Sequence, residues 1–150
     1  MAVVDTSNFG KLEYQEDAAL VFPRGLPGFE DARGFLPVHQ PENDPLIFLQ
    51  SLEDSSVCFV TVPILVVDPD YRLEIENEDR ETIGLAPRRP RIGQDVLCLA
   101  VLSLREEGPT ANLRAPVVVN LANRQGVQAV ARRGGYSHRQ PLCAPEALAC

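Results

Sequence analysis

The chain has 150 residues, of which 45% are hydrophobic and 23% charged, and we expect one hydrophobic core. A chain of this size buries most of its surface as a single domain, and its composition lies outside that of disordered proteins. The longest uncharged apolar run, Val62–Val67, contains Pro63 and is far shorter than the roughly 20 residues that cross a bilayer. We therefore expect no membrane partner. Because no signal-peptide pattern precedes Lys11, we expect a cytoplasmic protein.

The net charge of −7 is divided unevenly along the chain. Residues 1–107 carry 9 Lys and Arg against 20 Asp and Glu, whereas residues 108–150 carry 5 against 1. An acidic surface repels the phosphate backbone of nucleic acids, so we expect no direct binding to RNA or DNA. A single-strand binding barrel would need stacking aromatics beside basic residues, and the one such local group, Arg132–Tyr136, contains two glycines that favour a turn.

Short segments rich in Val, Ile, Leu and Phe recur about every ten residues between Pro, Gly, Asn and Asp, which is typical of an antiparallel all-β fold. We therefore predict a compact, barrel-like single domain over residues 1–140, monomeric when free. The predicted strands are Gly10–Tyr14, Ala19–Phe22, Phe35–Val38, Leu46–Ser51, Val57–Val62, Tyr71–Ile75, Asp95–Leu104, Pro116–Asn120 and Val127–Ala131.

Two stretches interrupt this rhythm and predict one or two short helical turns. In Glu78–Gly84, clustered acids precede a glycine that can end a helix. In Ala144–Ala149, Pro145 can occupy the first helical position, but so short a terminal segment does not overcome the nucleation cost alone. We expect residues 141–150 to form a flexible tail.

The sequence contains no nucleophile elbow, P-loop, dinucleotide-binding fingerprint or zinc-protease motif, so we expect no enzyme. Asp68–Glu74 has acids at alternate positions, as in a calcium loop, but Arg72 occupies a ligand position and the required glycine is missing. Cys58 and Cys98 lie in apolar strands as small hydrophobes, and the four cysteines lack the spacing of a zinc site. We predict no metal and no cofactor.

The segment Phe22–Glu30 has the composition of a rigid loop. Pro23 and Pro27 fix φ, while Gly25 and Gly28 permit conformations that other residues avoid. Such a loop holds its apolar side chains at fixed points, where they either cap the end of a barrel or form a presented patch. These side chains are Phe22, Leu26 and Phe29.

In the segment Thr110–Asn120, a polar, turn-forming entry leads into a short β-branched strand. We interpret Asn112 and Asn120 as side chains that close backbone hydrogen bonds at turns, and Pro116 as the start of a strand compatible with a sheet edge. The alternative is that Asn112 contacts a partner.

The order and spacing of several short motifs over residues 3–136 resemble those of the flagellar assembly factor FliW family. The matching residues are Phe22, Gly25 to Glu30, Leu49-Gln50-Ser51, Asp70-Tyr71, Asn112 to Pro116, Asn120, Gln128 and Tyr136. Among them, the motif residues to which we assign structural roles are Gly25, Pro27, Gly28, Gln50, Asn112, Pro116, Asn120 and Gln128. The tail after Arg139 matches nothing in the family pattern.

The resemblance implies a β-barrel protein that binds two protein partners in turn and catalyses nothing. Members bind cytoplasmic flagellin and, once flagellin is exported, bind CsrA, a dimeric mRNA-binding repressor of flagellin translation, whose repression is then relieved. An acidic protein suits the basic surface that CsrA must present to RNA, since complementary charge speeds encounter.

We assign two hypothetical partner sites on this basis. The CsrA site comprises the acids of one segment with a net charge of −5, namely Asp68, Asp70, Glu74, Glu76, Glu78, Asp79 and Glu81. The flagellin site is a groove beside Phe22, Leu26 and Phe29 that would accept the apolar face of a helix. The alternative for the whole protein is a small ligand-binding or carboxylate-based hydrolytic β-barrel, which would carry inward-facing acids.

Overall fold

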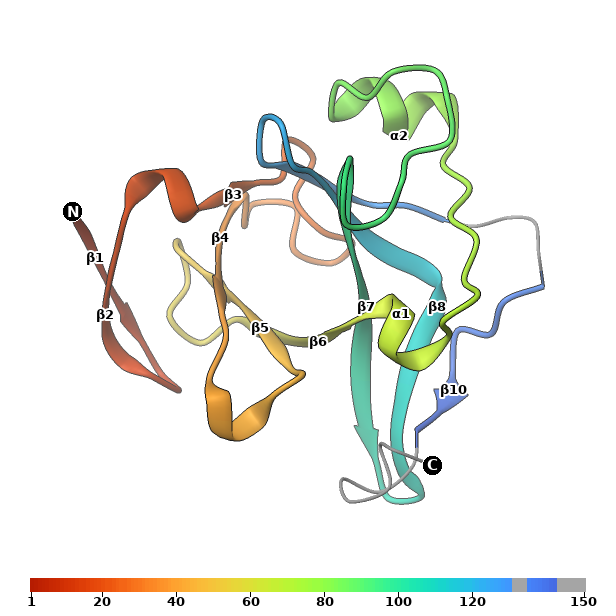
Figure 1. Cartoon of the computed structure of the whole chain (residues 1–150). Helices are drawn as coiled ribbons and strands as arrows, with labels where there is room; N and C mark the ends of the chain where they lie inside the picture. The colour runs from red at the N-terminus through yellow and green to blue at the C-terminus, as the bar shows by residue number, and fades with distance from the viewer. Residues whose placement is uncertain (131–134, 143–150) are drawn as a thin grey trace.

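Seven strands close into a barrel in the computed structural model, which describes residues 1–130 and 135–142 (Figure 1). Neighbouring strands pair antiparallel, except β3 and β9, which pair in parallel, and the pairing of β9 with β8 completes the ring. The barrel strands are β3 (Leu20–Val21), β4 (Gly34–Val38), β5 (Ile47–Ser51), β6 (Cys58–Pro63), β7 (Val96–Arg105), β8 (Gly108–Asn120) and β9 (Gln125–Gln128). The prediction of an all-β, barrel-like fold is therefore confirmed.

Two further pairings lie outside the barrel. Strands β1 (Ala2–Thr6) and β2 (Gly10–Tyr14) form a separate antiparallel hairpin, which packs on the barrel through an edge-to-face contact between Phe9 and Phe48, 5.3 Å apart. Strand β10 (Gln140–Pro141) pairs with β8, and the Leu142 amide donates to the Pro109 carbonyl, so residues 140–142 are attached to the sheet. Residues 143–150, where we expected a flexible tail and a second helical turn, lie outside the described residues.

The hydrophobic residues form two layers that share strands β7 and β8. Leu99 and Val117 face the barrel interior with Phe22 and Phe35, whereas Cys98 and Val118 face outward. The segment between β6 and β7 covers this outer face with Ile64, Tyr71, Leu73, Ile75 and Ile83. Because both faces of the sheet are covered here, Val96–Val101 of β7 and Val117–Val119 of β8 are continuous apolar runs rather than alternating ones.

The helices are short and lie between β6 and β7 or in the loops before β5. Helix α2 (Asn77–Thr82) confirms the predicted helical turn and is followed by Gly84 at φ +71°. Helix α1 (Ile64–Val67) was not predicted, because its apolar sequence has the composition of a strand. Two turns of 3-10 helix, η1 (Glu16–Ala18) and η2 (Pro41–Asn43), complete the set in the described residues. None of these helices is long and apolar enough to span a membrane.

Three strand predictions need correction. Tyr71–Ile75 is extended and alternates buried and exposed side chains as predicted, but it pairs with no strand in the described part of the chain. Strand β8 begins at Gly108 rather than Pro116, since the polar entry segment is itself paired with β7. Strand β9 spans Gln125–Gln128 instead of the predicted Val127–Ala131. Strand β1 was not predicted, because it is a short strand whose side chains are exposed or half-buried except for Thr6.

Candidate functional site

The Phe22–Glu30 loop is fixed by a tight turn at Leu26–Phe29. The Phe29 amide donates to the Leu26 carbonyl at 2.7 Å, with Pro27 second and Gly28, at φ +84°, third in the turn. This is the geometry of a type II turn, which needs positive φ at its third position. Gly25 also has positive φ, and an added Cβ there would lie 2.5 Å from the Glu30 carbonyl oxygen. The motif thus encodes a defined backbone path.

Only one of the three predicted flagellin-site residues reaches the surface. Phe22 is fully buried against Phe35, with ring centroids 5.4 Å apart, and Leu26 is 3% exposed. Phe29 is 41% exposed and contacts Phe59 edge-on at 5.2 Å. The structure therefore places Phe22 and Leu26 in the barrel core, where interior packing holds them, and leaves Phe29 as the accessible apolar group of the loop.

Asn112 and Gln128 bond to the backbone of an irregular stretch of β8. Pairing with β7 jumps from Asn112 to Val117, so the intervening residues 113–116 form a bulge in β8. The Asn112 Oδ1 accepts hydrogen bonds from the amides of Arg114 and Ala115, both at 3.0 Å. The Gln128 Nε2 donates to the Ala115 carbonyl at 3.0 Å, and the Pro116 carbonyl accepts from the Ala129 amide. These side chains satisfy backbone groups that the ladder leaves unpaired.

Two tyrosines of the family pattern meet at the same bulge. The Tyr71 hydroxyl donates to the Leu113 carbonyl at 2.6 Å, and its ring lies 4.4 Å from that of Tyr136. The Tyr136 hydroxyl accepts from the Arg72 amide at 3.0 Å. Burial raises the pKa of Tyr71 far above its usual value of 10.0, so the hydroxyl remains a neutral donor. The extended Tyr71–Ile75 segment is thus held by side chains instead of a strand partner.

Gln50 and Asn120 also bond to the backbone of neighbouring loops. Gln50 is fully buried, and its Nε2 lies 3.1 Å from the Ser51 carbonyl and 3.2 Å from that of Ser55. The Asn120 Nδ2 donates to the Ile83 carbonyl at 2.8 Å, while its Oδ1 accepts from the Ala122 amide. Asn120 thereby ties the loop after α2 to the end of β8.

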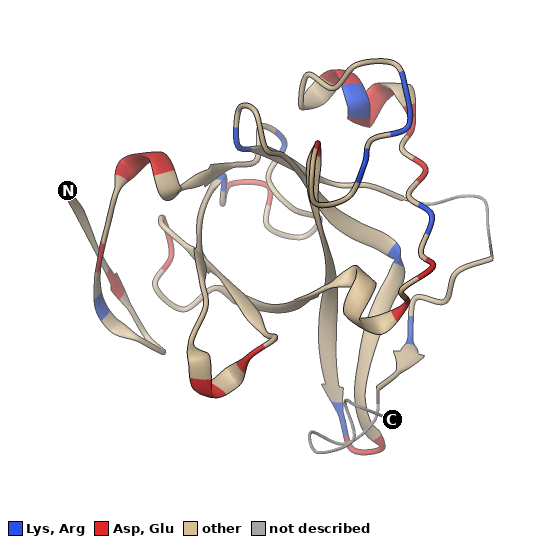
Figure 2. Ribbon diagram, in the orientation of Figure 1, with Lys and Arg blue, Asp and Glu red and all other residues tan. Residues whose placement is uncertain are grey.

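The acids assigned to CsrA binding follow the segment from α1 to α2, and Figure 2 shows arginines interspersed with them. Asp70, Glu74, Glu76, Glu78 and Glu81 are exposed, whereas Asp68 and Asp79 are partly buried. Arg24 pairs with Asp79 and, at 3.6 Å, with Glu78, and Arg89 lies 3.8 Å from Glu74. The segment is therefore acidic but partly neutralised by arginines from elsewhere in the chain.

The Arg80 side chain binds backbone carbonyls on both sides of α2. Its guanidinium donates to the carbonyls of Ile75 at 2.9 Å, Ala86 at 3.3 Å and Arg88 at 3.0 Å. The side chain braces the loop that follows α2.

A second group of acids surrounds Phe29, and the sequence reasoning missed it. These acids line a pocket of about 290 Å³ beside Phe29 and are Glu30, Asp31, Glu53 and Asp54. The antiparallel pairing of β4 with β5 brings the residues before β4 next to those after β5. A prediction of this hairpin register from the sequence would therefore have placed the four acids together. Hydrogen bonds from Ser56 lower the pKa of Asp54, and Glu53 accepts from the Gly34 amide at 2.8 Å.

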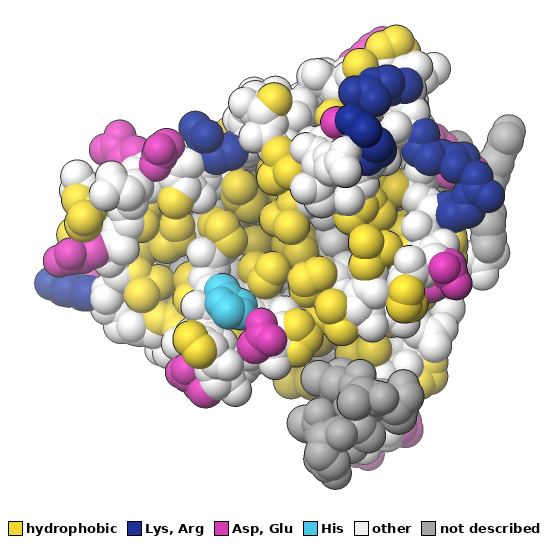
Figure 3. Space-filling view, viewed as in Figure 1, with side chains coloured by type: hydrophobic (Ala, Val, Ile, Leu, Met, Phe, Trp, Pro, Cys, Tyr) yellow, Lys and Arg dark blue, Asp and Glu magenta, His cyan; other side chains and the backbone are white. Residues whose placement is uncertain are grey.

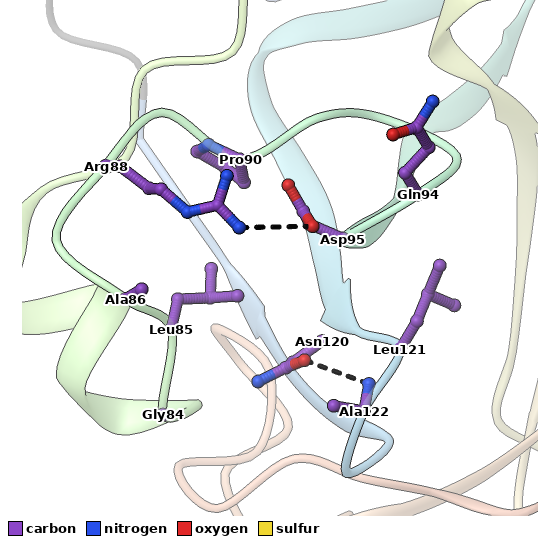
Figure 4. A pocket seen from close by; sticks show the side chains of 10 residues that line it. All are labelled: Gly84, Leu85, Ala86, Arg88, Pro90, Gln94, Asp95, Asn120, Leu121 and Ala122. Carbon is purple, nitrogen blue, oxygen red and sulfur yellow. Dashed lines mark hydrogen bonds and ion pairs between the residues drawn. The ribbon is translucent and has the colours of Figure 1, made fainter.

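A pocket with a volume of about 420 Å³ lies between the loop after α2 and the ends of β7 and β8 (Figure 4). Its walls include Leu85, Pro90 and Leu121, and Arg88 forms an ion pair at 3.7 Å with Asp95, which also lines the pocket. Hydrogen bonding from the Arg91 backbone lowers the pKa of Asp95, so this carboxylate stays charged. Asn120 is the one residue of the family pattern that lines this pocket.

The described residues also bear on metal binding and on the alternative of a hydrolytic barrel. They contain no group of three or more His, Cys, Asp and Glu side chains placed to hold a metal ion. Burial raises the pKa of Cys98 to about 12, so its thiol is not a ready nucleophile. The buried polar side chains of the described chain are Thr, Gln, Ser and Asn, with no Asp or Glu among them, whereas a hydrolytic barrel would need inward-facing acids.

Comparison with known proteins gives consistent results. A family model described as FliW protein matches residues 3–142. Flagellar assembly factors FliW from Caldanaerobacter subterraneus subsp. tengcongensis and Thermotoga neapolitana are each 31% identical to the chain, covering 93% and 96% of it and 91% and 95% of their own lengths. A crystal structure of the flagellar assembly factor FliW superposes with a TM-score of 0.82 at 27% identity, covering 95% of this chain and 98% of that one. The chain therefore belongs to the FliW family of flagellar assembly factors.

Proposed function

We propose that this chain is a non-enzymatic, cytoplasmic regulator of flagellar assembly that binds two protein partners in turn. It binds flagellin and, when flagellin has been exported, binds CsrA and relieves CsrA repression of flagellin translation. The observation that carries the proposal is the family match over residues 3–142, which includes the barrel and the covering segment.

The proposed CsrA surface is the exposed part of the acidic segment. Glu74 and Glu76 are exposed because they alternate with the buried Leu73 and Ile75, and Glu78 and Glu81 lie exposed on α2. This geometry supports the proposal because a row of outward carboxylates on a fixed backbone complements an RNA-binding protein that is basic. Such complementarity acts mainly on association rate and orientation.

The proposed flagellin contact is centred on Phe29. The turn at Leu26–Phe29 holds this side chain at 41% exposure on a rigid loop, where an apolar helix face can pack against it. Since Phe22 and Leu26 are buried, their part is to support the loop rather than to contact the partner.

Calorimetry with CsrA and flagellin from the same organism tests both partners. Reversing Glu74, Glu76 and Glu78 to lysine should weaken CsrA binding while flagellin binding is retained. The matched control reverses Glu42, Glu106 and Glu107, which are exposed on other loops and give the same change of net charge. Equal CsrA affinities of the two triple variants at low salt would exclude the acidic segment.

For flagellin, Phe29→Asp should weaken binding and leave CsrA binding unchanged. Leu104→Asp is its control, because Leu104 is 79% exposed and far along the β7–β8 hairpin. Failure of the unaltered protein to bind either partner would overturn the proposed function itself.

A further inference from the structure

The pocket of about 420 Å³ between the loop after α2 and the ends of β7 and β8 has no part in the function proposed above. Its walls come from three separate stretches of chain, and Figure 4 shows Leu85, Arg88, Asp95 and Leu121 arranged around the opening. Pockets of this size with a few fixed polar groups are the usual form of a binding site in proteins.

The walls of this pocket are held in place although the loop has no regular structure after α2. The Ile83 carbonyl accepts from Asn120 at 2.8 Å and from Asn123 at 3.1 Å. On the far side, Arg80 donates to the carbonyls of Ala86 and Arg88. Side chains on both flanks therefore fix the loop, and a ligand would meet a preformed surface and lose less entropy on binding.

The pocket combines an apolar lining with a cationic rim. Pro90 is buried and Leu85 half-buried, while Leu121 is 44% exposed and offers aliphatic surface. Figure 3 shows basic side chains gathered over the loop between α2 and β7. This loop carries Arg88, Arg89 and Arg91, of which Arg88 lines the pocket, Arg91 shares Asp95 with it, and Arg89 lies 3.8 Å from Glu74.

The guanidinium groups at the rim have donors to spare. Asp95 is shared by Arg88 at 3.7 Å and by Arg91 at 3.5 Å, and its Oδ2 already accepts the Arg91 amide at 2.8 Å. The side chains of Arg88 and Arg91 are 61% and 63% exposed. A guanidinium presents five N–H donors, so one shared carboxylate leaves most of them available to a second acceptor.

We propose that this pocket is a docking site for a protein segment that carries an aliphatic side chain beside a carboxylate. The aliphatic group packs against Leu85, Pro90 and Leu121, and the carboxylate accepts from Arg88 at the rim. This inference stands apart from the proposed function, because neither the acidic segment nor Phe29 lines the pocket.

The test uses NMR of the isotopically labelled full chain titrated with short blocked peptides of leucine and glutamate, to about 2 mM, where even weak binding of millimolar affinity is visible. We expect amide shifts confined to residues 84–95 and 120–122, and a loss of affinity of about tenfold or more in Arg88→Glu. Leu121→Asp should weaken the same titration.

Two controls make the outcome decisive. Matched peptides of leucine and lysine should bind at least about tenfold more weakly, since the rim is cationic. Arg105→Glu alters an exposed arginine at the other end of β7 and should leave the titration unchanged. Absence of shifts, shifts centred elsewhere, or equal binding of the lysine peptides would overturn the proposal.

Discussion

The Tyr71 hydroxyl donates a 2.6 Å hydrogen bond to the Leu113 carbonyl and so joins the segment between α1 and α2 to the bulge in β8. Both groups are buried, and Leu113 lies at the point where β8 stops pairing with β7. One side chain therefore secures both the covering layer and the irregular part of the barrel wall.

Tyr71→Phe should lower the free energy of unfolding by about 1 to 3 kcal/mol, because it leaves a buried carbonyl without its donor. Urea unfolding followed by circular dichroism measures the change. Tyr14→Phe is the control, since the Tyr14 hydroxyl has no hydrogen bond within residues 1–130 and 135–142. Equal stability of the two variants would contradict the role of the Tyr71 bond.

Gly25→Ala should destabilise the protein more than Gly10→Ala. Both glycines have nearly the same φ, +65° and +66°, so the backbone strain of an alanine is matched at about 1 to 2 kcal/mol. Only at Gly25 would the new Cβ meet backbone, at 2.5 Å from the Glu30 oxygen, which adds about 1 to 3 kcal/mol. Thermal unfolding of the two variants gives the difference directly, and equal melting temperatures would show that the Glu30 contact relaxes freely.

Asn112→Ala should lower stability by about 0.5 to 2 kcal/mol, as does the loss of a side-chain cap, because the amides of Arg114 and Ala115 lose their acceptor. Asn77→Ala, at the exposed start of α2, serves as the control. If Asn112→Ala instead weakened partner binding with an unchanged melting temperature, Asn112 would be a contact residue.

The sequence predicts the barrel well because the barrel depends on local signals. Apolar runs punctuated by Pro and Gly mark β4, β5, β6 and β7, and each of these strands pairs with a neighbour in sequence. The extended Tyr71–Ile75 segment has the same alternation but lies on the outside of the barrel, where its hydrogen bonds go to side chains such as Tyr136. Hydrophobic periodicity indicates which face of a segment is buried, but it does not indicate which groups bind the backbone amides and carbonyls of that segment.

The candidate sites were less predictable than the fold, because their character depends on distant residues. Arg24 and Arg89 neutralise part of the acidic segment from outside it. Phe22 and Phe29 belong to one motif, yet one is fully buried and the other exposed, which only the turn geometry decides. The pocket beside Asn120 is lined mainly by loop residues, and Asn120 is the residue among them that belongs to the family pattern. No sequence motif therefore indicated this pocket.

The unfolding free energy should fall as pH rises from about 9 toward about 12, in part because of Cys98. Burial raises the pKa of this thiol from 9.0 to about 12 in the folded protein, so the unfolded chain releases the proton first. Stability from the neutral thiol is therefore complete below pH 9 and lost as pH approaches 12. Cys98→Ala should flatten this slope in urea unfolding measured across the same pH range, and a slope identical to that of the unaltered chain would contradict the shift.

Arg24→Ala should speed association with CsrA at low salt if the acidic segment is the CsrA surface. Arg24 pairs with Asp79 and Glu78, and its removal makes the segment more negative while leaving the carboxylates in place. Charge changes at the rim of an interface act mainly on association rates, so we expect an increase of about two- to fivefold that vanishes at high salt. Stopped-flow measurement gives the association rate of each variant. Arg105→Ala is the control, because it removes one positive charge at the end of β7, away from the acidic segment. A similar increase in both variants would point to net charge alone, whereas an increase confined to Arg24→Ala places the encounter at α2.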